Sequence, residues 1–303
     1  MITRDTDSFL KFARQCRAHF GTATARAAFL VAPDGFARAE QSASDNAYMA
    51  QAGAFDAAAA MAQHRGLHRA LSTELPVMCF PGDPHTPDAL FPNNVFATAP
   101  GRLIVGRMRH EVRRREAVRA DLRRFFTGLL GYREIDLSMQ PHPCELTGAL
   151  VIDRARGLGY CGLSERCDEA GAALMHEAFG LRATLMFDLA AGEYHTNVVL
   201  AVLAGRAALI CPAGFADPAV AEAIAGLYAP HGIVLSPAEH AGFAGNAIAL
   251  TEASVWMSAG AEAALTAGTR QRLADAGFQR RSVALDAIEA AGGSLRCCVA
   301  EIF

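Results

Sequence analysis

Short apolar runs alternate along the chain with longer stretches whose apolar residues recur at helical spacing. The short runs are typical of strands, and the longer stretches predict amphipathic helices. The predicted strands cover residues 27–31, 76–80, 95–98, 103–105, 149–152, 159–162, 183–187, 196–203, 207–211, 233–235, 246–250, 253–257, 281–284 and 296–302. The predicted helices cover residues 8–20, 54–71, 117–130, 168–179, 218–228 and 261–276.

The order strand, strand, helix, strand recurs about five times, at about 60 residues per unit. Such recurrence favours a repeat architecture over two separate halves, and no linker rich in Ser, Gly or Pro divides the chain. We therefore predict one α/β catalytic domain over residues 27–303, preceded by a helical extension over residues 1–26. A doubly wound sheet remains open as an alternative.

The length and charge of the chain limit the classes of protein to which it can belong. The chain has 303 residues, of which 52% are hydrophobic and 19% charged, with a net charge of -3. This composition suits a large buried core and argues against a nucleic-acid binder or a disordered chain. No apolar run approaches the ~20 residues of a membrane span, and the first residues lack a signal-peptide pattern. We expect a cytoplasmic protein with no membrane partner, and the sequence leaves a homodimer open.

A run of arginines lies between Arg107 and Arg124. Acidic residues are interleaved with it, namely Glu111, Glu116 and Asp121. This mixture predicts a solvated, salt-bridged helix start rather than a nucleic-acid surface.

The eight cysteines form no CxxC pair and no Cys/His cluster with zinc spacing. Four lie in apolar, strand-like runs and are predicted to be buried reduced thiols: Cys79, Cys161, Cys211 and Cys298. Cys297 differs because it follows a Gly-Gly turn on the last predicted strand. Neighbouring side chains on a strand face opposite sides, so only one of Cys297 and Cys298 can face a pocket.

An imidazole and a carboxylate complement this thiol. His195 lies where a turn enters the predicted strand 196–203, and Glu145 follows a proline-containing turn. Taken singly, a buried thiol, a half-buried His and an exposed Glu are the more common cases. Together the three are the groups that a cysteine hydrolase needs, provided that they meet in space.

Two adjacent amides, Asn93 and Asn94, close the segment 87–94 just before an apolar run. They are either turn residues or neutral hydrogen-bonding groups at the rim of a site.

Five segments resemble, in order and spacing, the guanidino-group-modifying superfamily. They read DALFPNN at 88–94, ELTG at 145–148, HTN at 195–197, FAGN at 243–246 and GSLRC at 293–297. The superfamily includes arginine deiminases, dimethylargininases, amidinotransferases and succinylarginine dihydrolases, and the chain is most similar to its arginine-deiminase-related, citrulline-hydrolase-like branch. The resemblance covers about residues 27–303 and implies a single-domain, five-bladed, pseudo-symmetric α/β propeller of ββαβ units. It also implies an active site at the axis that uses neither a metal nor a cofactor.

The resemblance implies roles for three residues. Cys297 is expected to be the nucleophile, and His195 the general acid and then the general base. Glu145 is expected to orient His195 and to stabilise its charged form. The family's Glu is normally followed by Gly, whereas Leu146 follows it here.

Further residues are expected to bind the substrate. At the positions of Asn94 and Asn197, arginine deiminases typically carry Asp, and two carboxylates grip a guanidinium cation. Neutral amides lose those charge-assisted bonds but suit a ureido group, so we expect a citrulline-like substrate, or an arginine derivative hydrolysed twice through a ureido intermediate. The other candidates are Asn93, Asp88, Asn46, Asn246 and, for a substrate carboxylate, Arg113 or Arg114.

The predicted function is a cysteine-dependent hydrolase that cleaves a C–N bond of a small guanidino or ureido amino acid. An amidinotransferase, which passes the amidino group to an amine, is the main alternative. A non-enzymatic relative exists, because a translation factor uses the same fold, and a thiol protease is a weaker option.

Overall fold

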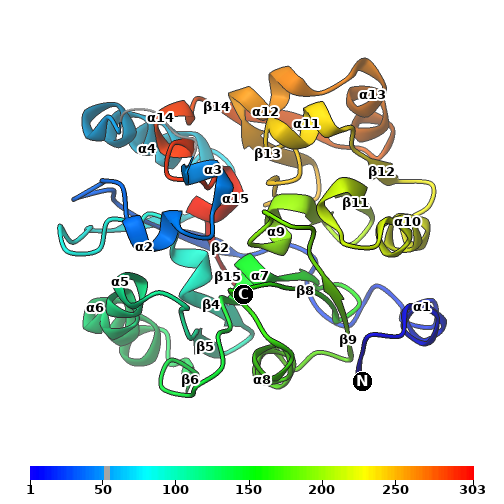
Figure 1. Cartoon of the computed structure of the whole chain (residues 1–303), viewed down its shortest axis with the longest axis horizontal. Coiled ribbons are helices and arrows are strands. Elements are labelled where there is room, and N and C mark those ends of the chain that lie inside the picture. Colours follow the sequence, from blue (N-terminus) through cyan, green and yellow to red (C-terminus); the bar gives the residue numbers. More distant parts are fainter. Residues whose placement is uncertain (51–54) are drawn as a thin grey trace.

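A computed structural model describes residues 1–50 and 55–303 of the chain. In these ranges the strands form five small sheets, which surround a centre of short helical turns, with longer helices outside (Figure 1). Each sheet is open, and no strand of the described ranges pairs with a strand of another sheet. The chain is therefore a mixed α/β protein, as predicted. The five-bladed propeller is a finer statement and remains a prediction.

Three sheets are built in the same way. Two antiparallel strands are followed by a helical crossover, and a third strand then pairs parallel to the second, as parallel neighbours require. Their strands are β4 (Phe96–Ala99), β5 (Arg102–Val105) and β6 (Arg133–Asp136); β7 (Leu150–Asp153), β8 (Leu158–Leu163) and β9 (Ala183–Asp188); and β10 (Leu200–Leu203), β11 (Ala207–Ile210) and β12 (Gly232–Val234). Their crossovers contain α5 (Glu111–Arg114), η2 (Arg115–Val118), α6 (Ala120–Arg124) and the π-helical turn η3 (Phe125–Leu129); α8 (Glu169–Phe179); and η4 (Pro212–Gly214) with α10 (Pro218–Leu227).

The two remaining sheets contain parallel pairs joined by helices. In one, β13 (Ser254–Ser258) pairs with β14 (Gln279–Val283) across α12 (Ala259–Ala264) and α13 (Ala267–Asp275). In the other, the last strand β15 (Ala300–Ile302) is antiparallel to β2 (Ala27–Val31), which is parallel to β3 (Val77–Phe80). The connection from β2 to β3 contains α2 (Glu40–Ala43), α3 (Ala47–Ala50) and α4 (Ala57–Leu71). Two further short helices are α11 (Pro237–Ala241), between β12 and β13, and α14 (Asp286–Glu289), after β14. One sheet thus joins the two ends of the chain.

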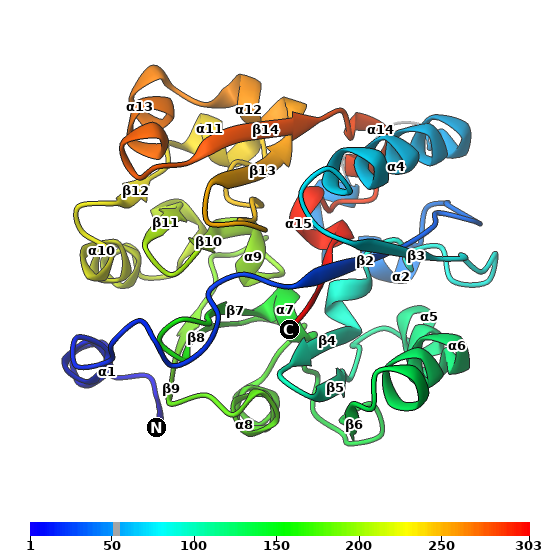
Figure 2. The ribbon, with the colours of Figure 1, turned by 180° about the vertical axis from the view of Figure 1, so that it is seen from behind.

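Residues 1–26, which we predicted as a helical extension, contain a strand as well as a helix. The short strand β1 (Ile2–Thr3) pairs parallel to β9, and two residues are too few to give a periodic pattern. Helix α1 (Thr6–Ala13) ends well before residue 20, where we predicted its end. Residues 14–26 then cross the rear face of the molecule to reach β2 (Figure 2).

Four short helical turns replace backbone that was predicted as strand or left unassigned. They are η1 (Pro92–Asn94), α7 (Leu146–Ala149), α9 (Thr196–Val199) and α15 (Leu295–Cys298). The predictions of strand over 196–203 and 296–302 were therefore wrong in their first halves. Every residue of α7 and α9 is buried. Exposed positions therefore do not recur with the period of a helix or of a strand, and the sequence pattern cannot distinguish the two.

Some other predicted boundaries also changed. The predicted helix 261–276 divides in two because the Thr266 hydroxyl caps α13 by accepting from the Thr269 backbone N–H at 3.1 Å. The predicted strand 246–250 reduces to a single bridge between Ile248 and Trp256. The first residue of the predicted helix 54–71 lies outside the described residues, and α4 begins at Ala57.

Three of the four thiols predicted to be buried are buried, but Cys79 is exposed. It lies on β3, an edge strand with one neighbouring strand, and none of the four residues of β3 is fully buried, so this apolar run is less covered than its composition predicted. No helix of the described residues is long and apolar enough to cross a membrane.

Candidate active site

The predicted catalytic residues meet where the short helical turns converge at the centre of the molecule (Figure 1). Glu145 directly precedes α7, His195 directly precedes α9, and Cys297 lies within α15. Turn α7 packs against both η1 and α9, and α15 packs against η1. Side chains from four distant segments therefore reach one place.

The His195 ring is oriented by Glu145. Both side chains are fully buried, and His195 Nε2 lies 2.8 Å from Glu145 Oε2. Glu145 also accepts from the Arg109 backbone N–H at 3.0 Å and from Arg166 Nη1 at 3.3 Å. Because the carboxylate only accepts, Nε2 carries the proton and Nδ1 is left as the free basic nitrogen.

Burial and charge set the protonation states of this pair. Burial alone favours a protonated Glu145, but the Arg166 charge and the His195 hydrogen bond outweigh it and lower the carboxyl pKa well below its usual range. Burial lowers the pKa of His195, and Glu145 opposes this only in part. At neutral pH the pair is therefore a carboxylate beside a neutral imidazole.

The Cys297 thiol is buried, at 1% exposure. Asn246 Nδ2 lies 3.3 Å from its sulfur, and Asn197 Oδ1 lies 3.8 Å from it. Burial raises the pKa of Cys297, and the Asn246 hydrogen bond opposes that rise. The resting sulfur is therefore a thiol that needs activation before it can attack.

The sulfur and the imidazole line one cavity, whose empty space including its opening to solvent is about 290 Å³. The lining consists of Ser42, Asn46, Met49, Asp88, Phe91, Asn94, Arg113, Arg166, Tyr194, His195, Ala291, Gly293 and Cys297. We call this the front cavity. Within residues 1–50 and 55–303, no cluster of three or more His, Cys, Asp or Glu side chains could hold a metal ion.

Three polar atoms of the lining side chains are buried without a hydrogen-bond partner among the described residues. They are His195 Nδ1, Asn94 Oδ1 and Asp88 Oδ1. The other Asp88 oxygen accepts from the Ser42 hydroxyl at 2.5 Å. Burial raises the pKa of Asp88, and Arg113 opposes the rise. Unpaired buried polar atoms are costly, so their presence at one cavity suits a ligand that donates hydrogen bonds to them.

The predicted site residues fall into two groups. Six line the front cavity: Cys297, His195, Asn94, Asp88, Asn46 and Arg113. Glu145, Asn93, Asn197 and Asn246 do not line it. Glu145 lies behind His195, and Asn197 and Asn246 form the wall behind Cys297.

Two of the six lining residues, Arg113 and Asn46, are held by several hydrogen bonds to other parts of the protein. Arg113 is 3% exposed and forms an ion pair with Glu116 at 2.8 Å, so the prediction of a solvated arginine run was wrong at this position. Its Nη2 also donates to the backbone oxygens of Asp88 and Phe91. The Asn46 amide donates to the Gly292 carbonyl at 3.3 Å and accepts from backbone N–H groups of α3. Both side chains are therefore buried against other parts of the protein rather than exposed to solvent.

The sequence analysis missed Arg166, which is 2% exposed and lines the front cavity. It contacts Glu145 and forms an ion pair with Asp45 at 2.5 Å. Nothing in its local sequence distinguishes it from a surface arginine, because both partners are distant along the chain.

Gly148 gives a test of this geometry. A Cβ atom at this position would lie 2.5 Å from Asn94 Oδ1 and 2.8 Å from both Nδ1 and Cε1 of His195. We expect Gly148→Ala to displace both side chains, to lower kcat/KM by about 10²-fold and to cost about 1–3 kcal/mol of unfolding free energy. Steady-state kinetics and urea unfolding measure the two effects.

Gly66→Ala is the matched control. Gly66 lies within α4, and a Cβ atom there meets nothing within 4 Å. We expect unchanged kinetics and a gain of about 0.5–1 kcal/mol, because alanine favours a helix over glycine. Wild-type kinetics in Gly148→Ala would show that His195 and Asn94 do not act from these positions.

Comparisons with known proteins agree with this fold. The model of the eukaryotic N,N-dimethylarginine dimethylhydrolase family matches residues 32–303. A search among curated proteins found no match.

Three solved structures are similar. One is the N-terminal domain of ArgZ, an arginine dihydrolase from the ornithine–ammonia cycle in cyanobacteria. Its form covalently bound to a reaction intermediate gives a TM-score of 0.79 at 19% identity, and the match covers 91% of this chain and 97% of that one. AgrE with ornithine and NAD⁺ gives 0.78 at 22% identity, covering 91% of this chain but only 39% of that one. A dimethylarginine dimethylaminohydrolase adduct with S-methyl-L-thiocitrulline gives 0.70 at 20% identity, covering 92% and 100%. At these identities the similarity shows a shared fold.

Proposed function

Because the chain belongs to the N,N-dimethylarginine dimethylhydrolase family, we propose that it hydrolyses a C–N bond of a guanidino or ureido amino acid through a covalent adduct on Cys297. One observation carries the proposal: the Cys297 sulfur and a histidine with a free Nδ1 line the same buried cavity. We also propose that the five sheets are the blades of a propeller with this cavity at its axis.

In the first half of the reaction, His195 Nδ1 takes the proton of the Cys297 thiol, and the resulting thiolate attacks the central carbon of the guanidino or ureido group. Protonated at Nδ1, His195 then gives that proton to the departing nitrogen, and the C–N bond breaks as an amine or ammonia leaves. Glu145 keeps Nε2 as the donor and stabilises the imidazolium. The adduct on sulfur is a thiouronium from a guanidino group or a thiocarbamate from a ureido group.

In the second half, neutral His195 takes a proton from water at Nδ1, and the resulting hydroxide attacks the same carbon. The C–S bond breaks and returns the thiolate. A thiouronium adduct releases a ureido product, and a thiocarbamate adduct releases a carbamate that loses carbon dioxide. A guanidino substrate can therefore pass through the site twice.

The charges of the front cavity suit a ureido group or a twice-hydrolysed arginine derivative. Asn94 presents a free amide oxygen where arginine deiminases typically have a carboxylate. Asp88 supplies one carboxylate with a free oxygen, which accepts N–H groups from either kind of substrate. A structural relative is an arginine dihydrolase, which supports the second possibility. Arg113 and Arg166 are the cations that favour a substrate carboxylate.

A substrate panel tests the proposal. The purified protein is incubated with arginine, citrulline, methylated arginines and N-acylated arginines, and ammonia, carbon dioxide and ornithine-type products are measured. We expect citrulline or its derivative to give an ornithine-type amine with ammonia and carbon dioxide. Activity on arginine that stops at citrulline would contradict the ureido assignment. Turnover that requires an added amine would identify an amidinotransferase instead.

A further inference from the structure

A second cavity, whose empty space including its opening to solvent is about 490 Å³, lies on the other side of the wall behind Cys297. We call it the rear cavity. Strands β7 and β10, Glu301 of β15, and Ala23 from the segment that crosses the rear face all contribute to its lining. Asn197 belongs to this lining and also contacts the Cys297 sulfur, so the two cavities share one wall.

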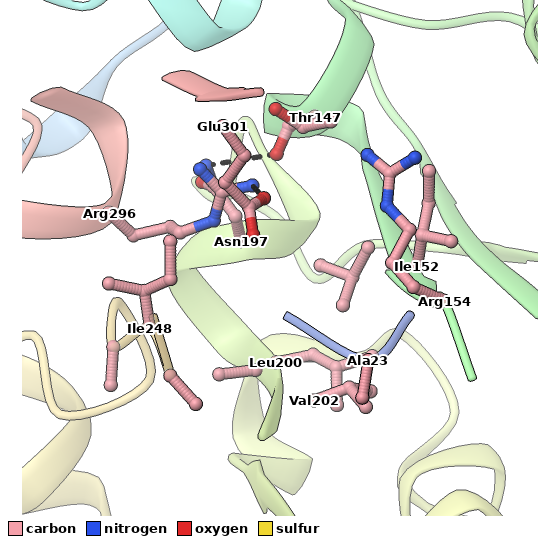
Figure 3. Close-up of a pocket in the computed structure, with 14 residues that line it drawn as sticks. Ala23, Thr147, Ile152, Arg154, Asn197, Leu200, Val202, Ile248, Arg296 and Glu301 are labelled. Carbon is pink, nitrogen blue, oxygen red and sulfur yellow. Dashed lines mark hydrogen bonds and ion pairs between the residues drawn. The ribbon is translucent and has the colours of Figure 1, made fainter. Parts of the chain in front are cut away.

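Three charged residues line the rear cavity, and their charges do not cancel. Arg296 Nη2 lies 2.9 Å from Glu301 Oε2, which forms one ion pair. Arg154 lies on the opposite side of the cavity from Arg296 (Figure 3), and its Nη1 donates to the Thr98 carbonyl at 3.1 Å. No carboxylate of residues 1–50 and 55–303 forms an ion pair with Arg154. Two cations and one carboxylate leave a net charge of +1 in the lining.

Arg154 is a half-buried cation that forms no ion pair among the described residues. Protein surrounds most of its guanidinium, and this burial lowers the pKa of Arg154 to about 10. Its ring contacts, with Phe303 at 4.1 Å and Phe179 at 5.2 Å, cover the flat faces of the guanidinium but not its N–H donors. Two guanidinium groups that line one pocket with a single carboxylate match a further planar oxyanion.

We propose that the rear cavity binds a small planar oxyanion, a carboxylate or bicarbonate, between Arg154 and Arg296. The polar amide of Asn197 and the hydroxyl of Thr147 are further hydrogen-bonding groups in the same lining. This binding does not depend on the proposed hydrolase function.

The bound anion acts on Cys297 through the shared wall. The Arg296 backbone N–H donates to Asn246 Oδ1 at 3.0 Å, and Asn246 Nδ2 lies 3.3 Å from the Cys297 sulfur. The positive charge of Arg296 favours the thiolate of Cys297. An anion beside Arg296 opposes that effect, so it slows reactions of the thiolate.

The test measures binding of acetate and of bicarbonate by isothermal titration calorimetry and by thermal unfolding, at constant ionic strength in chloride. We expect either oxyanion to raise the Tm, since tenfold excess over Kd shifts the folding equilibrium about elevenfold. Which of the two binds more tightly identifies the oxyanion. We also expect both to slow iodoacetamide alkylation of Cys297 severalfold. Equal effects of chloride and the oxyanions would overturn the proposal.

Two variants change the charge of the rear cavity in opposite directions. Arg154→Met removes the unpaired cation, so we expect no response to oxyanions and a higher Tm without them. Glu301→Gln leaves two unpaired cations, so we expect binding at least about tenfold tighter. This second variant keeps the test decisive if the first fails to fold, because unchanged affinity in Glu301→Gln would overturn the proposal.

Arg102→Met is the matched control. Arg102 likewise forms no ion pair in the described residues and donates to the Ala178 carbonyl, but it does not line the rear cavity. We expect this variant to bind oxyanions as the wild type does. Loss of binding in Arg102→Met, with binding kept in Arg154→Met, would place the anion elsewhere and refute the assignment.

Discussion

Replacing Cys297 with alanine is expected to lower kcat/KM by about 10⁴-fold or more, because the sulfur that forms the covalent adduct is removed. The same change deletes one buried atom and is expected to cost only about 1 kcal/mol of unfolding free energy. Kinetics on the substrate identified by the panel measures the first effect, and chemical denaturation measures the second.

Cys298→Ala is the matched control, since the two thiols are adjacent and both are buried. Only Cys297 lines the front cavity. We expect the control to keep turnover within a few-fold of the wild type and to lose a similar amount of stability. Full activity in Cys297→Ala, or loss of activity in Cys298→Ala alone, would show that the nucleophile has been misassigned.

Replacing Glu145 with glutamine is expected to lower kcat by about 10²–10⁴-fold with little change in shape. The carboxylate accepts from His195, Arg109 and Arg166, whereas an amide must turn its NH₂ toward one of these donors. An NH₂ facing His195 Nε2 moves the ring proton to Nδ1 and removes the free base. If the NH₂ instead faces the Arg109 backbone N–H or the Arg166 guanidinium, two hydrogen-bond donors face each other without an acceptor.

The pH dependence gives a second readout of Glu145→Gln. Burial lowers the pKa of His195, and Glu145 opposes this. Without the carboxylate the pKa falls further, so the protonated imidazole that donates to the leaving group disappears at lower pH. We expect the alkaline limb of the kcat profile to move to lower pH in the variant.

Glu165→Gln is the control for a lost carboxylate. Glu165 is an exposed residue that forms an ion pair with Arg109 at 2.6 Å, and an exposed pair contributes about 0–1 kcal/mol. We expect wild-type kcat and an unshifted pH profile. An unshifted profile in Glu145→Gln as well would mean that Glu145 does not set the protonation of His195.

The recurring strand order was predictable because it depends on short-range patterning. Apolar runs of β4 to β12 are separated by turns and amphipathic helices, and these local signals survive folding. The helical turns α7, α9 and α15 were not predictable, because every residue in them except Arg296 is buried, so exposed polar positions do not recur at helical spacing. The same burial explains why Cys297 lies on a helical turn rather than on the predicted strand.

The candidate site was only partly visible in the sequence. Its thiol, imidazole and carboxylate were recognisable from their local settings and from the family resemblance. The role of Asn197 as part of the wall behind the sulfur, the protein partners of Arg113 and the lining position of Arg166 were not, since each depends on contacts between distant segments.

The sequence by itself determined the class of fold, the family and the residue types available for the chemistry, because local periodicity and spaced motifs encode them. Tertiary structure alone decided which nitrogen of His195 is free and which oxygen of Asp88 is unpaired. It also decided that Arg154 lacks an ionic partner in the described part of the chain. The physical reason is that hydrogen bonds and charge pairing in a buried site depend on how segments distant along the chain cross at the centre, and local spacing does not specify those crossings.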